Sequence, residues 1–157
     1  DDANQNQNKT SREESKDIGK EAITLFGTTI RWDKLPELIN FFLFLDEKLN
    51  SDKETSDDKK SNINTSFLYR LLEYHRMALR FLDKNKIEGL KYLSALSYDV
   101  GRNIVEKDKD GRITKGQEEQ EVLQALINKI PDKDSLIYNI KVPLFWALYR
   151  NRKTFID

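Results

Sequence analysis

The sequence predicts a mainly α-helical fold: an antiparallel helical bundle of about five helices, preceded by a short strand remnant and a disordered polar leader. Three observations predict it. Apolar residues recur every three or four positions through most of the chain after residue 33, which is the period of an amphipathic helix. A β-branched and aromatic stretch at 21–30 is typical of a strand. Residues 1–19 contain almost no apolar side chains, so they cannot bury enough surface to offset the entropy of ordering.

Length and composition exclude several classes of protein. The 157 residues suit one domain, and 27 basic residues balance 27 acidic ones, so any basic surface must be local. The chain has no cysteine, which excludes a disulfide scaffold, a thiolate zinc site and a cysteine nucleophile. No apolar run reaches the ~18 residues that cross a bilayer. The N-terminus shows no signal-peptide pattern, and we therefore expect a cytoplasmic protein without a membrane partner.

The strand segment is the most informative part of the chain. Residues 21–26 and 28–30 are typical of one strand, or of two short strands that meet at Gly27. A lone strand leaves its backbone donors and acceptors unpaired and cannot form a sheet. We therefore expect that 20–32 closes a sheet whose other strands lie elsewhere, and that the chain is a C-terminal fragment or one piece of a larger assembly.

The first predicted helix follows the strand segment directly. Asp33 is expected as its N-cap and Pro36 lies in its first turn, where a missing N–H costs nothing. The helix is expected to end near residue 49. Phenylalanines outside its main apolar stripe indicate that it is covered on more than one side. The nearly all-polar segment 50–62 is expected to be a mobile loop.

Further helices follow this loop. Their predicted ranges are 67–82, 87–105, 117–130 and 135–152. Thr65 or Ser66 is expected to cap the first of these, and Pro143 is expected to kink or restart the last. In the range 87–105, Ser94, Ser97 and Gly101 share one side, where small residues allow a close helix–helix approach.

No pattern in the sequence indicates an active site or a metal site. Residues 106–117 resemble the first half of a calcium loop, with acidic residues at alternate positions. The first ligand position is Glu106 and the twelfth is Gln117, which cannot supply a bidentate carboxylate, so we favour a solvated Asp-Gly turn between two helices. His75 lies within an apolar stripe, and we expect it to be buried and paired with a backbone carbonyl or a tyrosine hydroxyl.

Two groups of cations are candidates for binding phosphate. The first is the outer face of helix 67–82, with Arg70, Arg76, Arg80 and Lys84, and its alternative is a solvated helix face. The second is 145–153, where aromatic residues alternate with Arg150 and Arg152. For this second group we favour aromatic core anchors with a solvated, cationic helix end.

Four segments of the chain, taken in order, resemble parts of a known protein family. Residues 22–35 (AITLFGTTIRWDKL), 66–73 (SFLYRLLE), 93–103 and 143–152 (PLFWALYRNR) resemble the C-terminal part of the large subunit of type III CRISPR effector complexes, closest to the Csm type. The resemblance covers residues 20–153, although its motifs are short and mostly apolar.

The resemblance implies a non-catalytic role in RNA-guided antiviral defence. In that family the large subunit has an HD nuclease domain and two palm domains. A Gly-Gly-Asp-Asp motif in one palm makes cyclic oligoadenylates from ATP with divalent metal, and a C-terminal helical bundle follows. Residues 20–32 would then close a palm (ferredoxin-like) domain, and 33–157 would be the bundle. Both catalytic motifs are missing from this chain, so no catalytic residue and no cofactor carries over to it.

The implied partners are the other type III subunits, especially the small subunit, together with guide RNA and target RNA. Arg70, Arg76, Arg80, Lys84, Arg150 and Arg152 are the residues to test for these contacts. Two alternatives stay open: a free-standing, small-subunit-like RNA-binding protein, and a protein–protein adaptor bundle.

Overall fold

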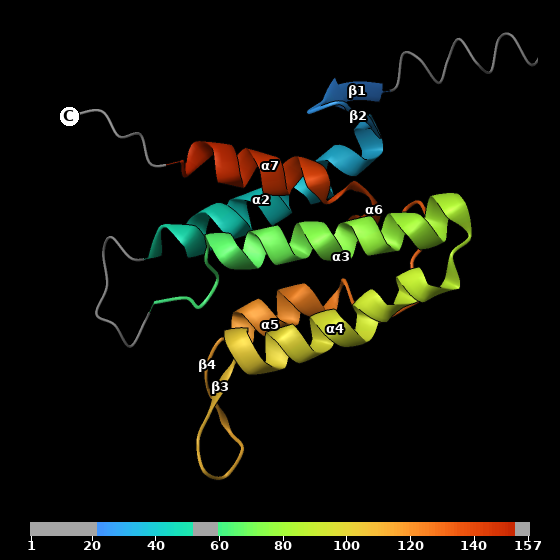
Figure 1. The fold of residues 1–157 in the computed structure, drawn as a ribbon. Coiled ribbons are helices and arrows are strands. Elements are labelled where there is room, and N and C mark those ends of the chain that lie inside the picture. The colour runs from blue at the N-terminus through green and yellow to red at the C-terminus, as the bar shows by residue number, and fades with distance from the viewer. Residues whose placement is uncertain (1–21, 52–59, 153–157) are drawn as a thin grey trace, which may run out of the picture.

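The computed structural model describes residues 22–51 and 60–152 (Figure 1). In this part of the chain it is mainly helical, with two small two-stranded antiparallel sheets, as the sequence predicts. The predicted leader 1–19 and most of the predicted loop 50–62 lie outside the described residues. The elements are β1 (Ala22–Leu25), β2 (Thr28–Arg31), η1 (Trp32–Lys34), α2 (Leu35–Leu49), α3 (Thr65–Lys84), η4 (Ile87–Lys91), α4 (Tyr92–Asp99), η5 (Val100–Ile104), β3 (Glu106–Lys107), β4 (Ile113–Lys115), α5 (Gln117–Gln124), α6 (Leu136–Asn139) and α7 (Lys141–Arg150).

The strand segment is a β-hairpin, so its interpretation as a solitary strand is wrong and its interpretation as two short strands is correct. β1 and β2 pair antiparallel, from Ala22 opposite Arg31 to Leu25 opposite Thr28. Phe26 and Gly27 form the turn with φ values of 49° and 73°. Two consecutive positive φ values are typical of the type I′ turn, whose twist matches that of the strands. The turn folds the segment back on itself, which sequence periodicity alone does not reveal.

The hairpin packs one face against the helices. Ile30 is 1% exposed and forms a small core with Leu38 of α2 and Val142 of α7, and Ile23 packs at its margin. The opposite face is polar. The hairpin therefore rests on the ends of α2 and α7, as the blue and red segments in Figure 1 show. The proposed boundary between residues 32 and 33, and the palm domain that the hairpin would close, stay predictions.

α2 begins after a single 3-10 turn, and the expected N-cap at Asp33 is wrong. Asp33 lies inside that turn, where its carboxylate accepts a hydrogen bond from the guanidinium of Arg31 at 2.8 Å. Pro36 lies in the first turn of α2, and the helix ends at Leu49, both as predicted. The prediction that α2 is covered on more than one side is confirmed, because five of its apolar side chains are buried: Leu38, Phe41, Phe42, Phe44 and Leu45.

α3 is the longest described helix and crosses the centre of the molecule. Asn64, and not Thr65 or Ser66, is its N-cap: the Asn64 side chain accepts a hydrogen bond from the backbone N–H of Phe67 at 2.9 Å. Asn64 has extended backbone angles, as an N-cap residue requires, whereas the helix already begins at Thr65. His75 is 5% exposed, and its Nδ1 donates to the carbonyl oxygen of Ile137 at 2.7 Å, which confirms the predicted pairing.

The predicted third helix is broken into three pieces. A 3-10 turn (η4) precedes α4, and a π-helical turn (η5) follows it, so the apolar stripe does not keep the α-helical period. Ile87, the first residue of the predicted helix, is 75% exposed. The expected close approach through Ser94, Ser97 and Gly101 is also wrong, because these residues are exposed. The close approach lies at Gly89, which is buried against α3.

The last elements are shorter than predicted. α5 ends at Gln124 and not at residue 130, and it follows the small hairpin of β3 and β4. The final helical segment is divided between Asn139 and Lys141, and not at Pro143. Pro143 lies in the first turn of α7, where its missing N–H costs no hydrogen bond. No helix in 22–51 or 60–152 has the length and apolar character needed to span a membrane.

Gly89 in η4 and Gly101 in η5 give a direct test of the close approach between η4 and α3. Gly89→Ala should lower the free energy of unfolding by about 1–3 kcal/mol or more, because a Cβ there would meet the Met77 carbonyl oxygen and lie 2.8 Å from the Phe81 backbone nitrogen. Gly101→Ala is the matched control: its Cβ would meet nothing within 4 Å, and alanine should raise helix stability by up to about 1 kcal/mol. Urea denaturation measures both, and equal effects would contradict the close approach.

Candidate nucleic-acid interface

The structure places the six predicted cations in two groups. Arg70, Arg76, Arg80 and Lys84 lie on α3, and Arg150 and Arg152 lie at the end of α7. Within each group the side chains have different surroundings. Four of the six have a partner that limits what else they can bind.

Arg70 is held in an ion pair and is not free to bind phosphate. Its Nε and Nη2 donate to the two carboxylate oxygens of Asp99 at 2.7 and 3.1 Å. Asp99 is 4% exposed and also accepts hydrogen bonds from the Tyr74 hydroxyl and the Asn103 amide, each at 2.7 Å. The Arg70 guanidinium also lies 5.4 Å from the ring centroid of Phe67. Arg70 therefore joins α3 to α4 and serves the fold.

The pKa values around Asp99 follow from this geometry. Burial alone raises the pKa of Asp99, but the hydrogen bonds from Arg70, Asn103 and Tyr74 outweigh it and hold the pKa below its usual value. Burial, and then the hydrogen bond to Asp99, raise the pKa of Tyr74 to about 12. Asp99 thus stays ionised and Tyr74 stays protonated. The sequence alone does not predict this network, because Arg70 and Asp99 lie 29 residues apart along the chain.

The other three α3 cations point outward in one row with a tyrosine and a glutamate, and we call this row the α3 stripe: Tyr69, Glu73, Arg76, Arg80 and Lys84. Their spacing of three and four residues places them on one exposed face of the helix. Arg76 forms an ion pair with Glu73. Arg80 and Lys84 form no ion pair with any residue that the structure describes. Of the four α3 cations predicted, these last two are the ones most available to a phosphate.

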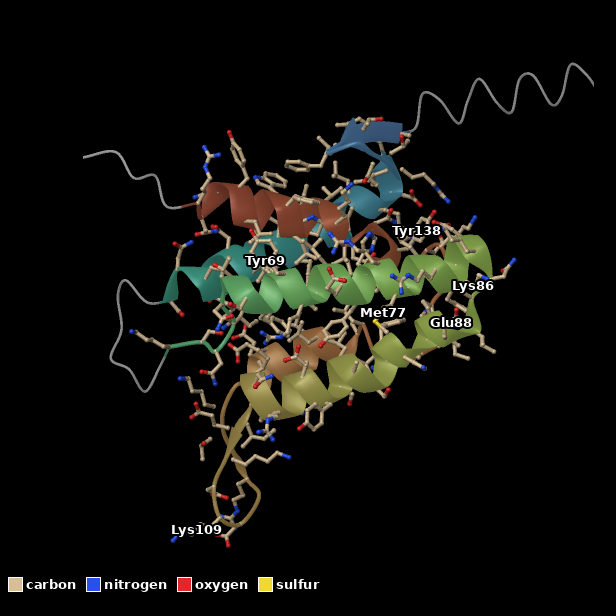
Figure 2. The ribbon with its side chains drawn as sticks, in the orientation of Figure 1. Tyr69, Met77, Lys86, Glu88, Lys109 and Tyr138 are labelled. Carbon is tan, nitrogen blue, oxygen red and sulfur yellow. The ribbon has the colours of Figure 1, made fainter. Side chains whose placement is uncertain are left out.

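A groove lies between α3 and α7, beside the first half of the stripe. Its volume is about 290 Å³, and it is lined by Tyr69, Arg70, Leu72, Glu73, Arg76 and Phe145. Figure 2 shows Tyr69 on α3, and α7 contacts both α3 and α2. The lining is largely aromatic and aliphatic, and the ion pair of Glu73 and Arg76 contributes charged groups. Sequence reasoning did not single out Tyr69, although its position four residues before Glu73 and seven before Arg76 places it on their face.

The α7 side of the groove is built by contacts around Phe145. The rings of Phe26 and Phe145 stack with centroids 6.2 Å apart and an interplanar angle of 24°. The Lys141 ammonium lies 5.4 Å from the centroid of the Phe145 ring. Positive charge from both helices converges here. Burial is the main cause that lowers the pKa of His75, and the charges of Lys141 and Arg76 lower it further.

The terminal group of cations is tied to the helices. Arg150 lies 3.2 Å from a carboxylate oxygen of Asp46 on α2, and the guanidinium of Arg152 lies 5.2 Å from the ring centroid of Tyr149. The Trp146 ring stacks on Phe42 with centroids 4.1 Å apart, so it joins α7 to α2. These contacts fit the interpretation of aromatic anchors with a cationic rim. Lys153 lies outside the described residues.

The calcium-like segment forms a turn stabilised by its own side chain. The Asp108 carboxylate accepts hydrogen bonds from the backbone N–H groups of Asp110 and Arg112, each at 2.9 Å. The turn connects β3 to β4, and not two helices as expected. In the part of the chain that the structure describes, no three acidic or histidine side chains are grouped to hold a metal ion.

Comparison of the chain with protein families, with curated proteins and with solved structures finds no match. A function is therefore inferred from the geometry above and from the resemblance of the four segments.

The Asp99 network predicts a pH-dependent loss of stability on mutation. A carboxyl group whose pKa is lowered by folding stabilises the fold at pH values above its ordinary pKa of 3.8. This stabilisation disappears as the pH falls through the folded-state pKa. Asp99→Asn should therefore lower the free energy of unfolding by about 1.5–3 kcal/mol at neutral pH. The difference from the wild type should shrink below pH 3.8.

Asp110→Asn is the matched control, because Asp110 is exposed and should change stability by less than about 0.5 kcal/mol. Urea denaturation across a pH series measures all three proteins. A deficit in Asp99→Asn that is constant with pH would contradict the ionised network.

Proposed function

We propose that this chain is the non-catalytic C-terminal part of the large subunit of a type III, Csm-type CRISPR effector complex in the cytoplasm. In this role it docks on the small subunit and faces the channel that holds guide and target RNA. Other parts of the same subunit would carry cyclic oligoadenylate synthesis, which uses ATP and divalent metal, and the HD nuclease.

One observation carries the proposal: two of the segments on which the resemblance rests line the α3–α7 groove, and a third stacks on its α7 wall. Phe26 comes from segment 22–35, Tyr69 from segment 66–73 and Phe145 from segment 143–152. Phe26 stacks on Phe145, and Tyr69 and Phe145 line the groove. Phe26 is 45% exposed and Tyr69 is 57% exposed, and a group of exposed apolar side chains bordered by charged residues is typical of a surface that contacts a partner.

The chemistry of this surface suits RNA. Arg80 and Lys84 continue the α3 stripe beyond the groove and can each neutralise a backbone phosphate. Lys141 adds a charge on the α7 side. Exposed aromatic rings next to cations are the combination that single-stranded nucleic acids contact.

A salt series tests the RNA-facing role. The chain should bind a short single-stranded RNA at low salt, and the logarithm of its affinity should fall linearly with the logarithm of the salt concentration. Arg80→Gln combined with Lys84→Gln should reduce that slope by about 0.7 for each phosphate that is no longer neutralised. Fluorescence anisotropy of a labelled RNA measures both quantities.

The matched control is Lys91→Gln combined with Arg112→Gln, which removes the same charge from exposed positions outside the α3 stripe. This variant should keep the wild-type slope. No binding at low salt would overturn the RNA-facing role and favour the protein–protein adaptor. Equal slopes in the two double variants would remove the α3 stripe from the interface.

A second experiment tests the assignment to a complex. The chain should co-elute with the small subunit of a Csm-type complex in size-exclusion chromatography, without RNA present. RNA binding without co-elution would favour the free-standing, small-subunit-like RNA-binding protein.

A further inference from the structure

We infer that the α3–α7 groove receives one unstacked base of a single-stranded RNA, with the base stacked on the ring of Tyr69. The inference rests on the proposed RNA-facing role and adds to it a defined site and a mode of recognition. It concerns the groove itself, whereas the salt dependence above concerns the phosphates along the α3 stripe.

Tyr69 has the properties of a stacking platform. Its side chain is 57% exposed, although it lies between the fully buried Leu68 and the half-buried Arg70, so it contributes little to the core. The ring belongs to a long helix whose rotation is fixed by the partly buried Arg70–Asp99 ion pair. A rigid, exposed aromatic ring can stack any base, because every base has a π face.

The size and lining of the groove suit one base. Its volume of about 290 Å³ lies just below the range of pockets that hold drug-sized molecules, ~300–1,000 Å³, as a site for a single base requires. Tyr69 and Leu72 from α3 and Phe145 from α7 supply apolar contacts. Arg76 and Glu73 pair with each other, but a guanidinium has five N–H donors and a carboxylate has several acceptor sites, so both groups keep positions that can meet the edge of a base.

The turn of the hairpin gives a second, independent observation. Phe26 occupies a left-handed position with φ of 49°, where a residue other than glycine costs roughly 1–2 kcal/mol and where asparagine, aspartate or glycine is usual. Its ring is 45% exposed and stacks on Phe145. Strained residues of this kind cluster at binding sites. Here the strain places an aromatic ring behind the α7 wall of the groove.

Charge favours RNA over a protein segment as the occupant. Arg76 lines the groove beside Glu73, Lys141 lies next to Phe145, and Arg80 and Lys84 continue along α3 beyond the groove, where Asp83 is the neighbouring acid. Asp83 accepts a hydrogen bond from the Tyr138 hydroxyl at 3.3 Å. An occupant that places an apolar ring in the groove and negative charges on either side of it matches this pattern, and a nucleotide within a strand has that chemistry.

The experiment compares a short single-stranded RNA with an abasic strand of the same length and charge. The chain of 157 residues should bind the RNA about 5- to 150-fold more tightly than the abasic strand, the range that stacking of one base supplies. Tyr69→Ala should remove this preference while leaving the salt slope of the affinity unchanged. Tyr69→Leu, which keeps an apolar side chain, should also lose the preference, and Tyr69→Trp should retain it.

Tyr98→Ala is the matched control, because Tyr98 is 66% exposed but lies on α4. This variant should keep the preference of the wild type, and circular dichroism should show that all variants are folded.

A wild type that binds both strands equally, or a Tyr69→Ala variant that keeps the preference, would overturn the base site. The proposed function would survive either result if binding still depended on Arg80 and Lys84, whereas no RNA binding at low salt would overturn both. Loss of small-subunit co-elution in Tyr69→Ala, without a base preference in the wild type, would assign the groove to protein docking instead.

Discussion

The carboxylate of Asp99 lies buried between α3 and α4, where Arg70, Tyr74 and Asn103 all donate to it. Because two of these donors come from α3, the network fixes the rotation of that helix about its axis. The residues on the adjacent turns then have a defined direction. Tyr69, Arg76 and Arg80 face outward as a consequence of where Arg70 is held. The geometry of the proposed interface thus depends on a charge pair that does not itself face the partner.

The groove is completed by elements from both ends of the described chain. α7 packs on α2 through the stacked rings of Phe42 and Trp146 and through the contact of Arg150 with Asp46. These contacts set the position of Phe145 opposite α3. The hairpin then rests on α2 and α7 through Ile30, Leu38 and Val142. The hairpin is therefore part of the structure that supports the groove, whether or not it also extends a sheet in a larger subunit.

Local patterns predicted α2, α3 and their buried faces, because an apolar period of 3.6 residues reports directly on which side of a helix is covered. The same pattern placed His75 in the core and indicated that a backbone group would satisfy it. Capping was harder to predict: Asn64, Thr65 and Ser66 are all residues that favour the N-cap, and the backbone angles decide among them. The first break within 87–105 is the 3-10 turn that contains Gly89, and the contact of Gly89 with α3 belongs to the tertiary structure and not to the local sequence.

The candidate site was only partly predictable for the same reason. The sequence identified the cations, because charge and helical spacing are local properties. It could not indicate that Asp99 engages Arg70 or that Asp46 engages Arg150, since those partners lie far away along the chain. The groove itself depends on how α7 crosses α3. Tyr69 and Lys141 therefore acquire a role only once the helices are packed.

The stacking of Phe26 on Phe145 has a consequence for how the protein forms during synthesis. The hairpin emerges from the ribosome well before α7, one of the two helices on which it rests. A two-stranded hairpin is marginally stable alone. Complete docking must therefore wait until α7 has been made, and such a long-range contact slows folding. Until then only α2 can cover the apolar face of the nascent hairpin, and a chaperone or a neighbouring strand can protect the rest of it.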